Sequence, residues 1–361
     1  MRPAPESMSS CYFWTALIMV GFIIMLLYIM IIKREKNVYY LDKDISDEEM
    51  NSLGNTFVKP SQIHLIITDD ADVYNADGSV LLLCFRKNKL SKAKTRVFYD
   101  NVIKFALSKT TNRGSTSGSK KINLINNPPV MTNILGYFDK FAPAQKQIIT
   151  RRRIKNLLNV RETRFNMDYP DKFKQMLPLI KEIDNCYKLY TPEYYAKQRK
   201  KANQTPFKIA GTSFTTVTTN VNFRTSIHKD RGDDEEGFGN LAVIEHGNYT
   251  GAETCLPQYG VGVDVRTGDI LFMNVHEWHG NLPMKPENAD VKRLSIVCYL
   301  RRNLWEKTKH KTRKFMLAHN KRVKGLRGLG EGMKGLGSGV QADQFGVLAN
   351  EREVDDVHHG E

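Results

Sequence analysis

Two histidines and an aspartate have the types and spacing that metal chemistry requires. His228 and Asp230 are two residues apart at the end of the strand-like run NVNFRTSIHKD. Residues i and i+2 of a strand face the same side, so this imidazole and carboxylate can chelate one ion. A third ligand must come from elsewhere. His279, in HEWHGNLP after the apolar run DILFMNV, is the candidate, and His276 in the same stretch is its competitor.

Two histidines and one carboxylate form the facial ligand set of non-haem Fe(II) oxygenases. Three positions on the iron then remain open, two for a keto acid and one for dioxygen. The far carboxylate of the keto acid needs a cation, and the planar fork of an arginine matches it. Arg293 opens the strand-like run RLSIVCYL, and Ser295 follows on the same face. The alternative interpretation is a β-sandwich with histidines on its surface.

The segments that would position these residues have the pattern of short strands. Between residues 214 and 301, short apolar or β-branched runs alternate with turns rich in Gly and Asp. Many short, evenly spaced strands predict a sandwich or a barrel. Two further strands are predicted nearer the N-terminus, from the runs IHLIIT and SVLLLCF.

Helices are predicted at two places. Ser46-Asp-Glu-Glu49 has the pattern of a capping box, which opens a short helix. Residues 145–200 are basic and helical in pattern, and their apolar positions predict a helix packed on a sheet. These positions are Phe173, Met176, Ile180, Ile183 and Tyr187. Residues 109–128, rich in Gly, Ser, Asn and Lys, predict a long loop of the functional or mobile kind.

The order of these motifs resembles the 2-oxoglutarate/Fe(II)-dependent dioxygenase superfamily, and most of all its TET/JBP-type branch, which includes algal and large-DNA-virus homologues. The resemblance rests on NRGSTSG (112–118), ILGYFD (134–139), RETRFN (161–166), NVNFRTSIHKDRGD (220–233), the run 248–283 and RLSIVCYLR (293–301). It implies an α+β fold with a double-stranded β-helix (jelly-roll) core and flanking helices, as one dioxygenase domain over residues 37–305.

The resemblance also implies a role for each site residue. The positions that match the iron ligands are His228, Asp230 and His279. Arg293 matches the arginine that grips 2-oxoglutarate, with Ser295 as its helper. Asn222 and Arg224 precede the His-x-Asp motif on the strand that lines the cavity, so they are the candidates for substrate contact.

Members of this branch oxidise the methyl group of thymine or 5-methylcytosine in nucleic acid. The resemblance therefore implies Fe(II), 2-oxoglutarate and dioxygen as cofactors and nucleic acid as a partner. Two alternatives stay open. A protein hydroxylase acting on prolyl or lysyl side chains suits a membrane-anchored enzyme better, whereas a non-catalytic jelly-roll scaffold is disfavoured by the complete triad and the arginine.

An apolar run near the N-terminus predicts a membrane anchor. Residues 11–32 are almost unbroken apolar residues, long enough to cross a bilayer as a helix after a short tail, residues 1–10. The rival interpretation, a cleaved signal peptide, lacks a small-residue cleavage site and has its charge on the wrong side. Lys33, Arg34 and Lys36 follow the run, so the positive-inside rule predicts a single-pass protein with a cytoplasmic catalytic domain.

The charge of the chain favours acidic partners. The net charge is +15, which suits nucleic acid, anionic lipid or an acidic protein surface. Five scattered cysteines without a CxxC pair fit a reducing compartment. Residues 306–361 are predicted to be a basic, then Gly-rich, disordered tail. Arg151 to Arg153 either touch phosphates or face water.

Overall fold

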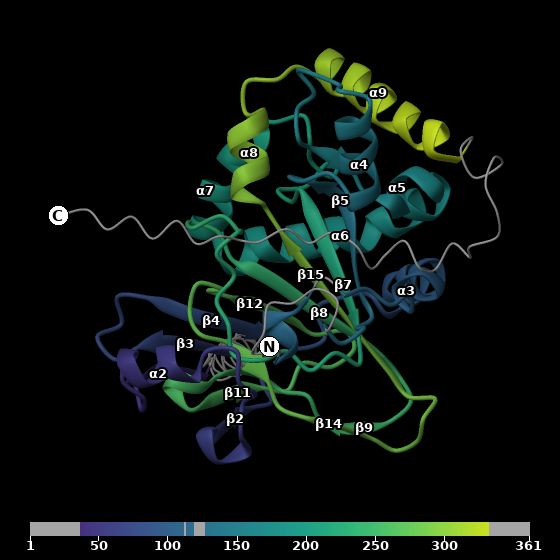
Figure 1. Cartoon of the computed structure of the whole chain (residues 1–361). Helices are drawn as coiled ribbons and strands as arrows, with labels where there is room; N and C mark the ends of the chain where they lie inside the picture. Colours follow the sequence, from purple (N-terminus) through teal and green to yellow (C-terminus); the bar gives the residue numbers. More distant parts are fainter. Residues whose placement is uncertain (1–36, 112, 119–126, 332–361) are drawn as a thin grey trace, which may run out of the picture.

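The computed structural model describes residues 37–111, 113–118 and 127–331, and two β-sheets form its centre (Figure 1). The larger sheet contains, in spatial order, β1 (Asn37–Leu41), β3 (Ala71–Asn75), β4 (Leu81–Arg86), β12 (Ile270–Met273), β8 (Gly239–His246), β15 (Lys292–Tyr299), β7 (Thr216–Val221), β5 (Thr132–Phe138) and β6 (Arg161–Glu162). The smaller sheet contains β13 (Gly280–Asn281), β10 (Thr254–Leu256), β11 (Val261–Val263) and β2 (Leu65–Ile67). A third pair joins β14 (Met284–Pro286) to β9 (Tyr249–Gly251).

Helices lie mainly against one face and one end of the larger sheet (Figure 1). The α-helices are α2 (Asp47–Leu53), α3 (Lys92–Ala106), α4 (Pro143–Arg151), α5 (Arg164–Asp168), α6 (Pro170–Tyr190), α7 (Pro192–Asn203), α8 (Arg302–Thr308) and α9 (Arg313–Glu331). Short 3-10 turns occur at η1 (Pro60–Gln62), η2 (Ser115–Ser117) and η3 (Pro257–Tyr259). The predicted α+β class is confirmed.

The larger sheet buries both of its faces, because successive strand residues point to opposite sides. In β12, Ile270 and Phe272 join the core under the helices, whereas Leu271 and Met273 join the core shared with β11 of the smaller sheet. The larger sheet therefore forms a middle layer between helices α3 and α6 and the smaller sheet.

The local predictions that build these layers are confirmed. The side chain of Ser46 accepts a hydrogen bond from the backbone N–H of Glu49 at 3.1 Å and caps α2. The predicted apolar run of 173–187 lies in α6, where Ile180, Ile183 and Tyr187 are buried in the core under the helices. The runs IHLIIT and SVLLLCF contain β2 and β4.

The predicted disordered tail is wrong over its first part. Residues 302–308 and 313–331 are helices α8 and α9, because Met316, Val323 and Leu326 form a narrow apolar stripe within the basic sequence. Residues 332–361 lie outside the described part of the chain. The predicted membrane span, residues 11–32, also lies outside it, and among the described residues no helix has the length and apolar character to cross a bilayer.

Candidate metal centre

A short antiparallel bridge places the two histidines side by side. The backbone N–H of His228 donates to the carbonyl of His279, and the reverse bond is also made, both at 2.9 Å. Paired residues of a bridge face the same side, and the two ring centroids are 4.3 Å apart. The backbone N–H of Asp230 donates to the carbonyl of Val275 at 2.9 Å, which brings its carboxylate beside both rings.

The donor atoms of these three residues converge as a metal site requires. The Nε2 atoms of His228 and His279 each lie 3.6 Å from an oxygen of Asp230. All three ligand atoms lie within 4.8 Å of one another. Ligands about 2.1 Å from one ion and at right angles lie about 3 Å apart, so a small inward movement completes the site.

Hydrogen bonds fix the tautomer of both rings. Nδ1 of His228 lies 2.7 Å from the carbonyl oxygen of Ser226, and Nδ1 of His279 lies 2.9 Å from that of Glu277. A carbonyl only accepts, so Nδ1–H is the donor in each ring and Nε2 keeps its lone pair. This is the common outer arrangement of metal-binding histidines, and the three side chains therefore fit a resident divalent metal ion.

The electrostatics keep the group in its metal-binding protonation state. Burial and the neighbouring His279 lower the pKa of His228 to about 4, so its ring is neutral near pH 7. Burial raises the pKa of Asp230, but the two adjacent histidine side chains outweigh burial and hold that pKa below its usual range. A neutral imidazole and an ionised carboxylate are the forms that bind metal.

His276, the competitor for the third ligand position, lies apart from this group. Its Nε2 atom is 3.2 Å from the backbone carbonyl oxygen of Asp234, and the backbone N–H of His276 donates to the side-chain oxygen of Asn274. Within the described residues, the group of three that could hold an ion contains His279 and not His276.

Arg293 and Ser295 lie on β15 on the side that faces the smaller sheet. Leu294 and Ile296 join the core under the helices, so the alternating residues Arg293 and Ser295 point the other way. Arg293 is 8% exposed, and among the described residues its guanidinium has no carboxylate partner. Its cross-strand neighbour Glu245 instead binds Arg266 at 3.0 Å. A buried cation without a counter-charge suits an anionic ligand.

Asn222, a predicted substrate contact, uses its amide group on the backbone. Its Oδ1 accepts from the N–H of Arg293 at 2.7 Å, and its Nδ2 donates to the carbonyl of Val291 at 2.8 Å. Its φ of 49° is in the left-handed region, which asparagine tolerates better than most residues. In this structure Asn222 therefore positions the strand that carries Arg293.

Arg224, the other predicted substrate contact, is held by the segment after α2. Its guanidinium lies 4.4 Å from the centroid of the Phe57 ring, and its Nη2 donates to the carbonyl of Val58 at 3.1 Å. Its buried Nε has no hydrogen-bond acceptor among the described residues. Arg224 thus keeps one donor for a ligand.

Arg113 is a residue of this site that the sequence did not single out. Its positive charge lowers the pKa of both His228 and Asp230, which places it near the centre. The loop that carries it docks beside the first histidine, since the backbone N–H of Ser226 donates to Thr116 at 2.8 Å. A single arginine in a Gly- and Ser-rich loop has no periodicity, and only its place in the NRGSTSG stretch could have marked it.

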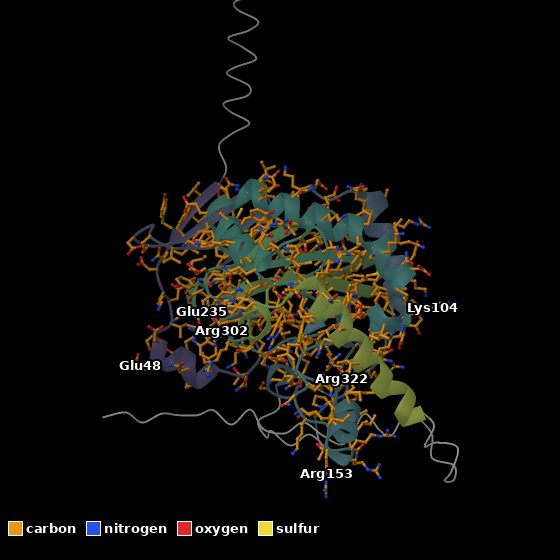
Figure 2. The ribbon with its side chains drawn as sticks, turned by 90° about the horizontal axis from the view of Figure 1, so that it is seen from above. Glu48, Lys104, Arg153, Glu235, Arg302 and Arg322 are labelled. Carbon is orange, nitrogen blue, oxygen red and sulfur yellow. The ribbon has the colours of Figure 1, made fainter. Side chains whose placement is uncertain are left out.

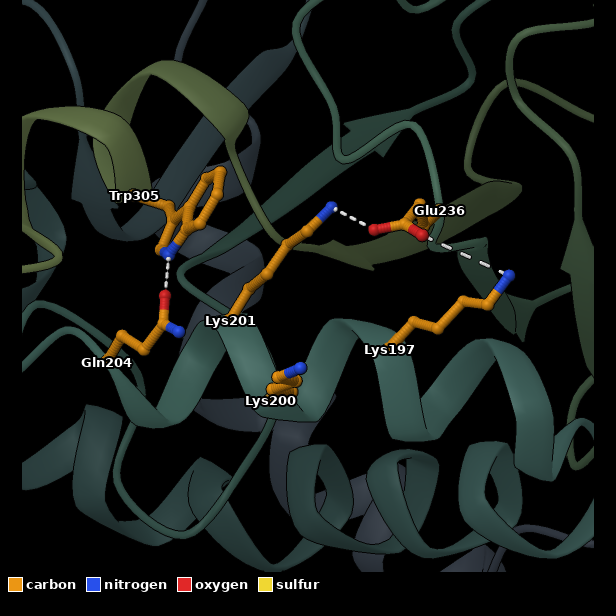
Figure 3. Close-up of a pocket in the computed structure, with 6 residues that line it drawn as sticks. All are labelled: Lys197, Lys200, Lys201, Gln204, Glu236 and Trp305. Atoms are coloured by element: carbon orange, nitrogen blue, oxygen red, sulfur yellow. Dashed lines mark hydrogen bonds and ion pairs between the residues drawn. The ribbon is translucent and has the colours of Figure 1, made fainter.

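The loop that follows Asp230 is tied to α7 by a lysine. Lys201 forms an ion pair with the buried Asp234. It forms a second ion pair, at 2.8 Å, with Glu236 (Figure 3). The same side chain borders a pocket with Trp305 of α8, whose indole N–H donates to Gln204. Helix α7 therefore fixes residues 234–236, a few positions after the carboxylate of the metal centre.

Comparison with known proteins identifies the class to which this fold and site belong. Residues 149–302, which contain the three clustered side chains and Arg293, match the family model described as the oxygenase domain of the 2OGFeDO superfamily. This region, which is less than half of the chain, therefore matches the Tet_JBP oxygenase domain, as the sequence predicted. The predicted cofactors Fe(II), 2-oxoglutarate and dioxygen are those of this superfamily.

The relatives include two kinds of curated protein from trypanosomatids. The chain is 32% identical over 204 residues to the bifunctional helicase and thymine dioxygenase JBP2 of Leishmania braziliensis, covering 56% of this chain and 17% of that protein. It is 31% identical over 209 residues to the thymine dioxygenase JBP1 of Trypanosoma brucei brucei, covering 57% and 22%. The chain therefore spans less than a quarter of these relatives' length.

A solved structure with some similarity is NgTET1 in complex with 5mC DNA. The alignment covers 72% of this chain and 92% of the NgTET1 chain, with 14% identity and a TM-score of 0.41. At these values the similarity of the two folds is weak.

Proposed function

We propose that this protein is an Fe(II)- and 2-oxoglutarate-dependent dioxygenase that hydroxylates the methyl group of thymine or 5-methylcytosine in nucleic acid. The observation that carries the proposal is the convergence of His228, Asp230 and His279 inside the part of the chain that matches the oxygenase family. The curated relatives with the dioxygenase name act on thymine, which favours a nucleobase over a protein side chain.

Each residue then has a role that its contacts support. His228, Asp230 and His279 hold the iron, and the backbone carbonyls behind the two rings keep each Nε2 aimed at it. Arg293 holds the far carboxylate of 2-oxoglutarate, with Ser295 beside it on β15. We assign the two facing sheets to the double-stranded β-helix, with residues 37–305 as one dioxygenase domain.

The protein positions the reacting groups and excludes water from the site. Bound iron, with dioxygen and 2-oxoglutarate, supplies the oxidation of a C–H bond and releases succinate and carbon dioxide. The target base leaves the helix to reach the metal centre, since a base that stays stacked and paired in the duplex cannot bring its major-groove methyl group to a site within the protein. Asn222 acts on this reaction indirectly, through the backbone of Arg293.

The test is turnover by the full chain in detergent micelles. Succinate release is measured with Fe(II), 2-oxoglutarate and air, in parallel on thymine DNA, 5-methylcytosine DNA and a peptide pool. Turnover that rises with one DNA and is lost in Asp230→Ala supports the proposal. Turnover that rises with peptides alone would assign the fold to a protein hydroxylase. A folded protein without turnover or Fe(II) binding would favour a scaffold.

We further propose that residues 11–32 anchor the enzyme in a membrane, with the catalytic domain in the cytoplasm. The length of the apolar run and the basic residues after it support this orientation. Alkaline carbonate extraction of membranes, followed by protease protection of sealed vesicles, tests both parts. A chain that washes off with carbonate contradicts the anchor, and a protected domain contradicts the orientation.

A further inference from the structure

The positive charge of this chain is concentrated in two segments. Residues 140–160 and 307–327 hold 15 of the 54 Lys and Arg residues and none of the 39 Asp and Glu residues. The rest of the chain therefore has equal numbers of basic and acidic residues, and these two segments account for the whole net charge of +15.

The fold brings the two segments together although about 150 residues separate them. Helix α9 packs against α4, which lies in the first segment, and against β6, which begins directly after that segment (Figure 1). Nε2 of His319 lies 2.8 Å from the carbonyl oxygen of Val160, and Nη2 of Arg322 donates to the carbonyl of Lys155 at 3.4 Å. Arg153 and Arg322 lie on the same side of the molecule, away from Glu48 and Lys104 (Figure 2).

We define the basic face as the exposed cationic side chains of α4, the turn after it and α9. Its members are Lys146, Arg151, Arg152, Arg153, Lys155, Arg313, Lys314, Lys321, Arg322 and Lys324. Among the described residues, none of these side chains forms an ion pair with a carboxylate. The charge is therefore not neutralised within the fold, and the cations repel one another until an anion binds.

The orientation of α9 favours the binding of a water-soluble anion over insertion of the helix into a bilayer. An amphipathic helix that enters a membrane presents its apolar face outward. In α9 the apolar stripe of Val323 and Leu326 is buried against the domain, and the lysines and arginines face out. Of the outward apolar side chains, Leu317 is 57% exposed, and Phe315 stacks on His319.

The dimensions of the face match a duplex. The members of the face on α9 run from Arg313 to Lys324, which is about 17 Å at 1.5 Å per residue. One turn of B-DNA is about 34 Å long, so these cations can follow the phosphates of about half a turn. Arg301 links the basic face to the loop that follows the metal ligands. It forms an ion pair at 2.8 Å with Asp139, just before α4, and its backbone is bridged to Asp233.

We propose that the basic face holds the phosphate backbone of a nucleic acid duplex while one base reaches the metal centre. This inference takes nucleic acid as the substrate from the proposed function. Phosphate contacts of this kind position a duplex without reading its sequence. They give the oxygenase domain affinity for DNA through its own surface, outside the catalytic pocket.

The experiment measures duplex binding by the full chain in phosphatidylcholine nanodiscs. Fluorescence anisotropy of a labelled 30-base-pair duplex gives Kd across a salt series. The test variant combines Arg151→Gln, Arg152→Gln, Lys321→Gln and Lys324→Gln. The matched control combines Lys92→Gln, Lys104→Gln, Lys174→Gln and Lys188→Gln, which are exposed lysines of α3 and α6 without ion pairs among the described residues.

We expect the test variant to weaken binding at least about tenfold near physiological salt, with no such loss in the control. The slope of log K against log salt should become shallower by roughly 2–4, at about 0.9 for each phosphate that the protein no longer neutralises. A third variant with Arg151→Lys, Arg152→Lys, Lys321→Arg and Lys324→Arg should keep the binding. Circular dichroism of all variants checks that they fold.

Four results would overturn the inference. Unchanged binding by the test variant, or equal losses in test and control variants, would remove the basic face as the site. Protection of α9 from hydrogen exchange by phosphatidylserine nanodiscs, with unchanged DNA binding by the test variant, would assign the face to anionic lipid. Base oxidation is measured on the same samples. DNA that is bound but not oxidised contradicts the proposed function alone, and oxidation that is equal in the test variant at limiting DNA contradicts the face alone.

Discussion

His279 and His276 are three positions apart, and the structure gives them different surroundings. The ring of His279 meets Asp230, whereas Nε2 of His276 meets a backbone carbonyl. We expect His279→Gln to lower Fe(II) affinity by more than about 100-fold, above the 10–100-fold typical of losing an outer partner of a ligand. His276→Gln should retain binding. Anaerobic titration of both variants with Fe(II) measures the difference, and equal losses would contradict the ligand assignment.

Two substitutions of Asn222 separate the effect of its positive φ on stability from the effect of its side-chain hydrogen bonds. Asn222→Gly removes two partly buried hydrogen bonds, and we expect it to cost about 2–4 kcal/mol of unfolding free energy. Asn222→Ala should cost about 1 kcal/mol more, because the positive φ disfavours a Cβ. Urea denaturation measures both values. An alanine variant as stable as the glycine variant would show that the left-handed conformation is not required.

At the scale of residues, sequence and structure agree where spacing carries the information. The His-x-Asp spacing predicted a shared ion, and the chain brings His279 to the pair as expected. The strand predicted to carry them is shorter than expected, because β7 ends at Val221, Asn222 has a positive φ, and His228 pairs only through a single bridge. The sequence does not show that the amide of Asn222 bonds the backbone of Val291 and Arg293, and its contact with substrate stays a prediction. Arg113 was missed because its neighbourhood depends on how a non-periodic loop folds back onto Ser226.

At the scale of elements, Lys201 joins helix α7 to the loop behind the metal centre (Figure 3). Lys201→Met leaves the Asp234 carboxylate, which is 2% exposed, without its cation. We expect a loss of about 3 kcal/mol of unfolding free energy, the lower end of the range for a buried pair, because Lys201 is partly exposed. Adding Asp234→Asn should recover part of the loss. Lys200→Met on the same helix is the control and should change stability by less than about 0.5 kcal/mol.

The docking of α9 should depend on pH through His319. Burial lowers the pKa of His319 below the value of a free histidine, so the folded state disfavours its protonated form. The stabilisation is complete above about pH 6.5 and is lost as the pH falls from there towards the lowered folded pKa. Hydrogen exchange of α9 at pH 5 and pH 7.5 measures this. His319→Gln, which keeps a donor for Val160, should remove most of the dependence, and an unchanged dependence would point to another group.

Helices were predicted correctly where apolar residues recur strongly at helical spacing. The prediction failed where many charged residues surround a few apolar ones. Helix α6 has a wide apolar face, and its packing follows from the sequence. Helix α9 places an apolar residue in its inner face only about once per turn among many basic residues, so composition predicts disorder. Its folding depends on the pocket around Val160, Phe207 and Leu304, which local sequence does not show.

At the scale of the whole molecule, the predicted domain end at residue 305 cuts through this packing. Leu304 of α8 is buried with Val160 and Phe207, and Met316 of α9 packs against the same cluster. We expect a chain ending at residue 305 to melt at a lower temperature than a chain ending at residue 331. Calorimetry of the two truncations measures the difference. Equal melting temperatures would mean that α9 adds no stability to the oxygenase domain.

The strands with strong local periodicity could be predicted. β1, β3 and β5 were not singled out from the sequence, and the order of the strands in the sheets could not be predicted. Short runs and turns identify strands through local periodicity. Pairings such as β1 with β3 and β2 with β11, both parallel, join segments whose partners are set by the surrounding layers. The division of the chain into a larger and a smaller sheet therefore follows from tertiary packing and not from any local motif.

The central place of β15 has a consequence for the synthesis of the chain. β15 lies between β8 and β7, and it is the last strand of the sheet to leave the ribosome. Until residue 299 emerges, both neighbours have unpaired edges and the proposed ligands of the iron have no closed sheet behind them. Such long-range pairing is slow and exposes strands to aggregation. The larger sheet therefore cannot close before β15 has been made, and chaperones that cover strand edges protect the unpaired strands until then.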